Sequence, residues 1–161
     1  MKKIVALILL LCGNALANEA YVKYGLGVFQ HEPNSLAEIK MLELGYQRPI
    51  WSVMTQQYSL GGWADQRHDL GRKSGGFAAY SLGVTPEWES VYFQALWGVA
   101  GITNPDSYLG GYGQFKGDLC AGAKDMKGVS VGVCYSHLSS AGIFLPNKGR
   151  DFTLIRMAIP W

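Results

Sequence analysis

Residues 129–139 read VSVGVCYSHLS, and this stretch decides the fold class. Its bulky apolar side chains stand at every second position, at Val129, Val131, Val133 and Tyr135, with small or polar residues between them. Such alternation has the period of a β-strand, whose successive side chains point to opposite faces of a sheet. The segment is therefore predicted to be a strand with one apolar face and one small, polar face.

The same alternation recurs along the chain after residue 17. Residues 91–99 and 153–161 place apolar or aromatic side chains at every second position, and residues 21–29 set them against lysine and glycine. The polar faces are mostly glycine, serine, lysine and glutamine, which suits a narrow polar lumen, so the bulky faces are expected to meet lipid. The sequence predicts an all-β fold, an eight-stranded antiparallel transmembrane β-barrel, with strands near 20–29, 36–46, 50–58, 76–84, 90–101, 108–120, 128–138 and 151–161.

The connections between these strands differ in length. Short connections at 47–49, 85–89 and 124–127 alternate with longer ones at 30–35, 59–75 and 139–150. Outer-membrane barrels have short periplasmic turns and longer outer loops, so the asymmetry predicts which end of the barrel faces outward. Residues 103–107 are the exception, because we expect a short outer loop there.

Composition narrows the function classes. The chain has 161 residues, of which 48% are hydrophobic, 12% aromatic and only 16% charged, with 21 glycines. This length suits one domain, and this composition excludes a disordered chain, a coiled coil and a basic nucleic-acid-binding protein.

The N-terminus has the pattern of a secretory signal. Residues 1–17 read MKKIVALILLLCGNALA, with two lysines, a short apolar run and a small-residue cleavage site. We therefore expect a signal peptide at 1–17 and an outer-membrane barrel at 18–161. Removal of two lysines and no acidic residue brings the formal charge from +2 to 0, which gives no reason to expect nucleic-acid binding.

Two cysteines and several charged residues fall on the predicted inner face. Cys120 and Cys134 flank a turn almost symmetrically, so a disulfide across a hairpin and a pair of free thiols facing the interior both stay open. Their spacing matches no metal motif. Four charged residues are expected to pair inside the lumen: Lys23, Lys40, Glu43 and Arg156.

A polar group continues the apolar stripe of the last two strands. His137 and Ser139 are the next positions after Tyr135 on the same face, and Asp151 shares that face at the start of the final strand. The alternation therefore gathers a hydroxyl, an imidazole and a carboxylate on the lipid-facing side, near a membrane interface. These groups are the components of nucleophilic acyl transfer, although His137 and Ser139 alone would be read as part of a polar interface girdle.

The surrounding residues resemble a known family. The run HLSSAG at 137–142, followed by PNKGRD at 146–151, is similar to the pattern H-x-S-N-x-G, then N-x-G, then an acid twelve residues after the serine, of the outer-membrane lipid A 3-O-deacylases of the PagL type. The resemblance covers roughly the last 25 residues. It implies an eight-stranded barrel of the Gram-negative outer membrane that hydrolyses the ester-linked acyl chain at position 3 of lipid A.

The resemblance also implies roles for individual residues. Ser139 would be the nucleophile, His137 the base and Asp151 the residue that orients it. Gly142, through its amide, and Asn147 would hold the oxyanion. The sequence departs from the pattern at Asp151, where the family usually has Glu, and at Ser140, which replaces the usual Asn beside the oxyanion site.

Three functions remain to be weighed. The first is a serine esterase acting on lipid A; the second is a non-enzymatic barrel, adhesin-like or structural; the third is an acyltransferase, whose acyl pocket would lie inside the lumen. For the first we expect lipid A or lipopolysaccharide as substrate, outer-membrane lipids around the barrel, no nucleic acid, and no metal or organic cofactor, with a homodimer left open. Basic loop residues are candidates for contacts with lipid A phosphates: Arg67, Arg72, Lys73, Lys148 and Arg150.

Overall fold

The computed structural model describes residues 18–28, 39–65, 73–106 and 108–161. The predicted signal peptide at 1–17 lies outside these residues. Within the described ranges, nine strands form one sheet: β1 (Glu19–Val28), β2 (Ile39–Trp51), β3 (Met54–Asp65), β4 (Gly75–Val84), β5 (Glu87–Trp88), β6 (Val91–Ile102), β7 (Gly113–Lys124), β8 (Ser130–Ser139) and β9 (Arg150–Pro160).

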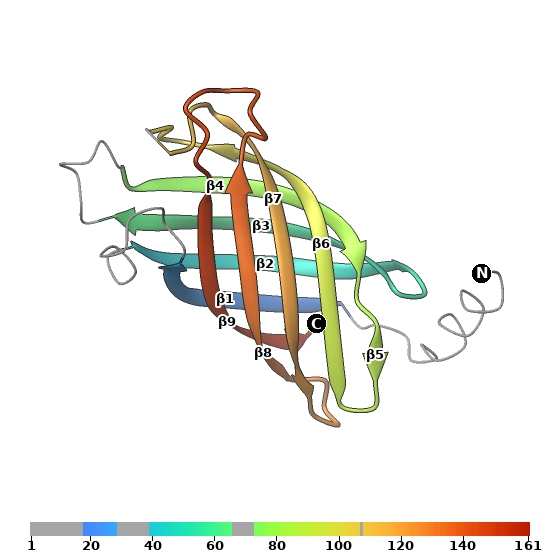
Figure 1. Ribbon diagram of the computed structural model, residues 1–161. Helices are drawn as coiled ribbons and strands as arrows, with labels where there is room; N and C mark the ends of the chain where they lie inside the picture. The colour runs from blue at the N-terminus through green and yellow to red at the C-terminus, as the bar shows by residue number, and fades with distance from the viewer. Residues whose placement is uncertain (1–17, 29–38, 66–72, 107) are drawn as a thin grey trace.

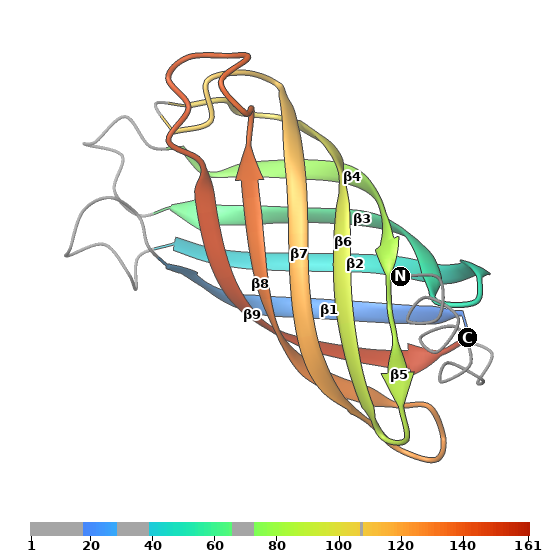
Figure 2. The same cartoon turned by 45° about the vertical axis from the view of Figure 1, so that its right-hand side comes forward.

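Eight of these strands close into an antiparallel barrel, as the alternation predicted (Figures 1 and 2). Neighbouring strands pair in chain order, β1 pairs with β9, and β4 pairs with β6. The ninth strand, β5, is two residues long and pairs with the start of β6. Closure satisfies the backbone hydrogen bonds of every long strand, which a structure in hydrocarbon requires.

The limits of three strands differ from the prediction. The third strand, predicted at 50–58, runs from Met54 to Asp65, so the long connection predicted at 59–75 begins only after residue 65. The second strand continues past residues 47–49, and the turn follows at Ser52, which has a φ of 41°. Pro49 had suggested a turn, but it lies next to a shift of register between β2 and β3, where a residue without an N–H is tolerated. The predicted strand at 108–120 begins only at Gly113, because the Asp106 carboxylate accepts hydrogen bonds from the N–H groups of Tyr108 and Leu109 and keeps that segment in a loop. The expectation of a short outer loop at 103–107 is therefore wrong, since the connection from Ile102 continues to Gly113.

The two faces of the barrel differ as expected. The outer face carries large apolar side chains such as Trp97, which is 65% exposed, and Ile155, which is 52% exposed. The alternate residues point into the lumen and are buried. In the part of the chain that the structure describes, no helical segment has the length and apolar character of a membrane-spanning helix.

Charged side chains fill the middle of the lumen. Lys23 contacts Glu43 at 3.2 Å and Asp118 at 2.8 Å, and Lys116 contacts both of these carboxylates, with all four side chains fully buried. The expected pairing of Lys23 with Glu43 is confirmed. Lys40, in contrast, is exposed on the outer face, because it stands at an odd number of residues from Glu43 on β2.

Nearer the short turns, Arg156 pairs with Glu19 at 2.7 Å inside the lumen. Cys120 and Cys134 lie directly opposite each other on β7 and β8 and form a disulfide that faces the interior. At the other end of the barrel, the β6–β7 and β8–β9 loops lie side by side (Figure 2), and the Tyr108 carbonyl accepts hydrogen bonds from the N–H groups of Lys148 and Gly149.

Candidate functional site

The candidate site lies where β8 ends and β9 begins. His137 and Asp151 are directly opposed partners in the antiparallel ladder, and Ser139 is the last residue of β8. Residues two apart on a strand share a face at roughly 6.5–7 Å between Cα atoms. The register therefore brings His137, Ser139 and Asp151 together on the outer face of the barrel.

The imidazole and the carboxylate are in direct contact. His137 Nδ1 lies 2.6 Å from Asp151 Oδ1, and the two side chains are 36% and 17% exposed. Asp151 thus reaches His137 although it is one methylene shorter than the glutamate usual in the resembled pattern. Because Nδ1 is engaged, Nε2 is the ring nitrogen left to face a reacting group.

A further side chain, Tyr135, enters the site. Its hydroxyl donates a hydrogen bond to Asp151 Oδ1, the same oxygen that His137 contacts. Sequence reasoning had assigned Tyr135 to the lipid-facing apolar stripe. The signal that could have found it is its position two residues before His137 on the same face.

The loop from 140 to 149 is shaped around the site by internal hydrogen bonds. Asn147 Oδ1 accepts from the backbone N–H of Ser140 at 2.9 Å, which leaves the Asn147 amide nitrogen as its donor group. The Ser140 side chain is buried, and its hydroxyl donates to the carbonyl oxygen of Phe144 at 2.9 Å. Ser140 is therefore turned into the loop, whereas Gly142, with a φ of +83°, has open space around its α-carbon.

Gly149 supports the imidazole from behind. Its φ is +70°, and a Cβ at this position would lie 2.9 Å from His137 Cε1 and 3.5 Å from Ser139 Cβ. A side chain here would therefore push against the ring and strain the backbone. The close contact between the Gly149 backbone and the His137 ring therefore requires a glycine at this position.

Arg150 lies between Gly149 and Asp151 and points the other way. Its guanidinium is fully buried in the lumen, contacts Asp65 Oδ2 at 3.0 Å and also contacts Asp106. The Arg150 Cζ atom lies 5.7 Å from the centre of the Trp63 ring and 5.3 Å from the centre of the Tyr108 ring. The expectation that Arg150 is a loop cation for lipid phosphates is therefore wrong, since strand alternation carries it inside; Arg67 and Arg72 lie outside the described residues.

Two depressions on the outer face adjoin the site. The first has a volume of about 410 Å³ and is lined by Trp97, Phe115, Gly117, His137, Ser139 and Ala141. Gly117 stands opposite both Trp97 and His137, and a Cβ on it would lie 3.3 Å from the Trp97 ring. The absence of a side chain at Gly117 thus creates a shallow trough beside Ser139.

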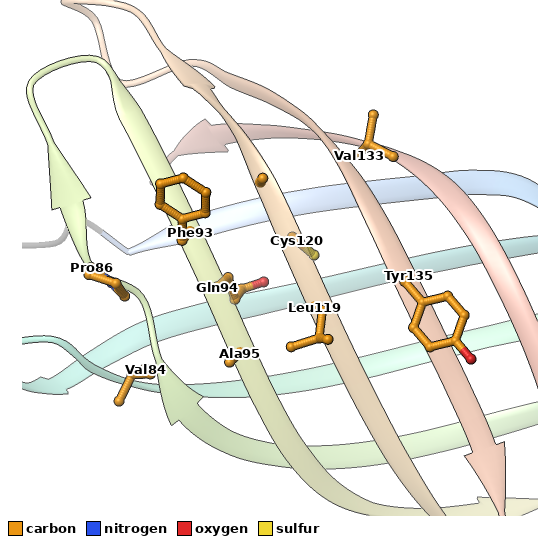
Figure 3. Close-up of a pocket in the computed structure, with 10 residues that line it drawn as sticks. Val84, Pro86, Phe93, Gln94, Ala95, Leu119, Cys120, Val133 and Tyr135 are labelled. Carbon is orange, nitrogen blue, oxygen red and sulfur yellow. The ribbon is translucent and has the colours of Figure 1, made fainter.

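The second depression continues along the same three strands (Figure 3). It has a volume of about 540 Å³, and its lining includes Phe93, Ala95, Leu119, Ala121, Val133 and Tyr135. Leu119 is two residues beyond Gly117 on the same face of β7 and is 54% exposed, so its side chain stands between the two depressions.

Within the described ranges, no group of three or more His, Cys, Asp or Glu side chains is arranged to hold a metal ion. The site as it stands offers a hydroxyl, an imidazole held by a carboxylate, and an apolar trough open to lipid. This combination suits attack on an acyl group attached to a membrane lipid.

Comparisons with known proteins agree with this geometry. The model of the family described as lipid A 3-O-deacylase (PagL) matches residues 39–160. Among solved structures, the fold is similar to that of "the outer membrane enzyme PagL", with a TM-score of 0.67 and 20% sequence identity, over 88% of this chain and 99% of that one. No curated protein matches the chain. Because the family match spans most of the sequence, the chain belongs to the lipid A 3-O-deacylase (PagL) family, whose members are β-barrel enzymes of the outer membrane.

Proposed function

We propose that this protein is a serine esterase that removes the ester-linked acyl chain at position 3 of lipid A, with Ser139, His137 and Asp151 as its triad. The observation that carries the proposal is the His137–Asp151 contact of 2.6 Å on the lipid-facing side of the barrel, next to Ser139. A structural barrel has no need for a paired imidazole and carboxylate at a boundary with hydrocarbon, where such polar groups are costly.

In the first half of the reaction, Ser139 Oγ attacks the ester carbonyl carbon. Its proton passes to His137 Nε2, while Asp151 holds Nδ1–H and stabilises the imidazolium that forms. The tetrahedral intermediate collapses, the bond between the acyl carbon and the sugar oxygen breaks, and His137 returns the proton to that oxygen. The products of this half are an acyl-serine and a lipid A with a free hydroxyl at position 3.

The negative oxygen of the intermediate needs hydrogen-bond donors. We assign this role to the Gly142 amide, whose surroundings are open, and to the Asn147 side-chain nitrogen, since the Asn147 oxygen is occupied by the Ser140 N–H. Ser140 contributes indirectly, by fixing the loop through Phe144. Removal of one such donor typically costs about 2.7–4 kcal/mol of transition-state stabilisation.

In the second half, water replaces the sugar. His137 Nε2 takes a proton from the water as it attacks the acyl-serine carbonyl, and it then gives the proton to Ser139 Oγ as the acyl bond breaks. A 3-hydroxy fatty acid is released and the enzyme is restored. All residues assigned to the reaction come from one chain, so it can proceed in a monomer or in a homodimer.

The trough over Gly117 supplies the place for the acyl chain that is cut. Its walls, Trp97 and Phe115, are apolar and face the surrounding lipid. A chain that starts at Ser139 can follow this trough without leaving the membrane. We infer that the long-loop end of the barrel faces the outer leaflet, where lipid A resides.

The decisive experiment compares lipid A from cells that express the wild type or Ser139→Ala. The wild type should yield lipid A that lacks one 3-hydroxyacyl chain by mass spectrometry, and Ser139→Ala should lower kcat by about 10⁴- to 10⁶-fold. Ser136→Ala is the matched control, because Ser136 is on the same strand but buried on the luminal face. A folded Ser139→Ala protein with full activity would refute the triad, and a wild type that leaves lipid A unchanged would favour a structural barrel.

A further inference from the structure

We propose that Tyr135 is a positioning residue of this site, which holds the short carboxylate of Asp151 in the orientation that His137 requires. The inference rests on the proposed triad and adds a fourth member to it. No chemistry is assigned to the tyrosine itself, since its hydroxyl touches Asp151 and not the reacting atoms.

The geometry places both donors on one oxygen. Tyr135 and His137 are two residues apart on the outer face of β8, and Asp151 lies on β9 directly opposite His137 and diagonal to Tyr135. The Tyr135 hydroxyl and His137 Nδ1 both bond Asp151 Oδ1. Two donors that converge on one oxygen from the same strand restrict the rotation of the carboxylate much more than one donor does.

The location of Asp151 makes a second donor valuable. This carboxylate lies at the boundary with hydrocarbon and is only 17% exposed, so water gives it little support. A carboxylate in such a place must be hydrogen-bonded to stay ionised at low cost. The phenol is amphipathic, so Tyr135 can supply this hydrogen bond while its ring lines the apolar depression of Figure 3.

The short side chain of Asp151 explains why a second hydrogen bond, from Tyr135, would matter. Asp151 has one methylene fewer than Glu, and it still reaches His137 at 2.6 Å. A short side chain has few rotamers that both reach the imidazole and leave Nε2 aimed at Ser139. Tyr135 selects among these rotamers, which predicts an effect on the chemical step and little effect on substrate binding.

The first test is Tyr135→Phe, which removes only the hydroxyl. We expect kcat for release of 3-hydroxy fatty acid from lipid A in detergent micelles to fall about ten- to a hundredfold, as for loss of a hydrogen bond to a charged group, while KM changes less than about twofold. The matched control is Tyr24→Phe, because Tyr24 is also on the outer face but lies on β1, opposite Ile155. It should retain wild-type kcat.

The second test asks whether the tyrosine acts through the carboxylate. In the Asp151→Glu background the carboxylate stands one methylene farther from the backbone and away from the position that the Tyr135 hydroxyl contacts, so Tyr135→Phe should lower kcat less than about fivefold. Equal losses in both backgrounds would overturn the proposed coupling. Folding of each variant is followed by the heat-modifiable migration of the barrel in gels, so a folding defect is measured separately.

The outcomes separate this inference from the proposed function. If Ser139→Ala and Asp151→Asn are fully active, the triad itself is wrong. If both are inactive while Tyr135→Phe matches Tyr24→Phe in kcat, the triad stands and the role of Tyr135 is refuted.

Discussion

Arg150 and Asp151 are neighbours in sequence, but their charged side chains point to opposite faces of the barrel. Arg150 points into the lumen, where two carboxylates and two aromatic rings surround it and leave none of its side chain exposed. Asp151 points outward, where a phenol and an imidazole contact it and both it and His137 stay partly exposed. One charge is enclosed by its partners, and the other remains within reach of a lipid.

The difference indicates how one strand can serve stability and chemistry together. Successive residues of a strand point to opposite faces. β9 therefore begins with Arg150, which is held in the lumen, and continues with Asp151, which belongs to the site. Arg150 ties the end of β3, through Asp65, and the β6–β7 loop, through Asp106, to the start of β9, at the end of the barrel where the site lies. We therefore expect luminal substitutions to change stability and outward ones to change catalysis.

Of the changes that test this comparison, the largest effect is expected for the outward charge. Asp151→Asn keeps the size of the side chain but removes the charge that stabilises the imidazolium, so kcat should fall by about 10³- to 10⁴-fold. The urea midpoint of unfolding in lipid vesicles should change little, because Asn keeps the size of the side chain and an oxygen that can accept a hydrogen bond from Tyr135 or His137. If the variant has a normal kcat and a lowered urea midpoint, Asp151 stabilises the barrel as Arg150 does, and the proposed contrast between the two residues is wrong.

The luminal counterpart is Arg150→Met. It removes the buried cation that contacts Asp65 and Asp106, which should destabilise the barrel by about 3–5 kcal/mol. The measurement is the free energy of unfolding from urea titrations in vesicles. Arg150→Met combined with Asp65→Asn and Asp106→Asn should recover part of the loss, and no recovery would show that the arginine does not act through these carboxylates.

Gly149 precedes Arg150 and lies against the His137 ring. Gly149→Ala adds a Cβ at 2.9 Å from His137 Cε1 and strains a backbone with a φ of +70°, so kcat should fall about tenfold as the ring is displaced. Gly128→Ala is the control, because Gly128 has a φ of +84° in the turn at the opposite end. Both variants pay a similar backbone cost of about 1–2 kcal/mol, and only Gly149→Ala should slow the reaction.

Much of this architecture was predictable from alternation alone. The period of two indicated eight long strands, the lipid-facing sides of those that contain 21–29, 91–99, 129–135 and 153–161, and the common face of His137, Ser139 and Asp151; on β2 the luminal position expected for Lys40 was wrong. The strand limits near Pro49 and Tyr108 were not predictable, because a register shift and the Asp106 side chain decide them. Tyr135 precedes His137 by two residues on the same face, but its role was missed because a tyrosine there also fits the lipid-facing stripe, and its contact with Asp151 depends on the pairing of β8 with β9.

The smallest expected effect concerns substrate choice on the outer face. Leu119 stands between the trough over Gly117 and the second depression, so it limits how far an acyl chain can extend along β7. Leu119→Ala should join the two and raise kcat/KM for longer acyl chains over shorter ones by a few-fold, which is at or below the low end of the about 1–3 kcal/mol that a methylene is worth in an enclosed apolar pocket, because these depressions are open to lipid. The measurement is competition between lipid A species that differ only in the length of the 3-O-acyl chain. The control is Leu44→Ala, an outward leucine on β2, away from the site. If Leu119→Ala lowers stability but leaves the chain-length ratio unchanged, the second depression is ordinary lipid-facing surface, and selectivity belongs to the trough beside Ser139 alone.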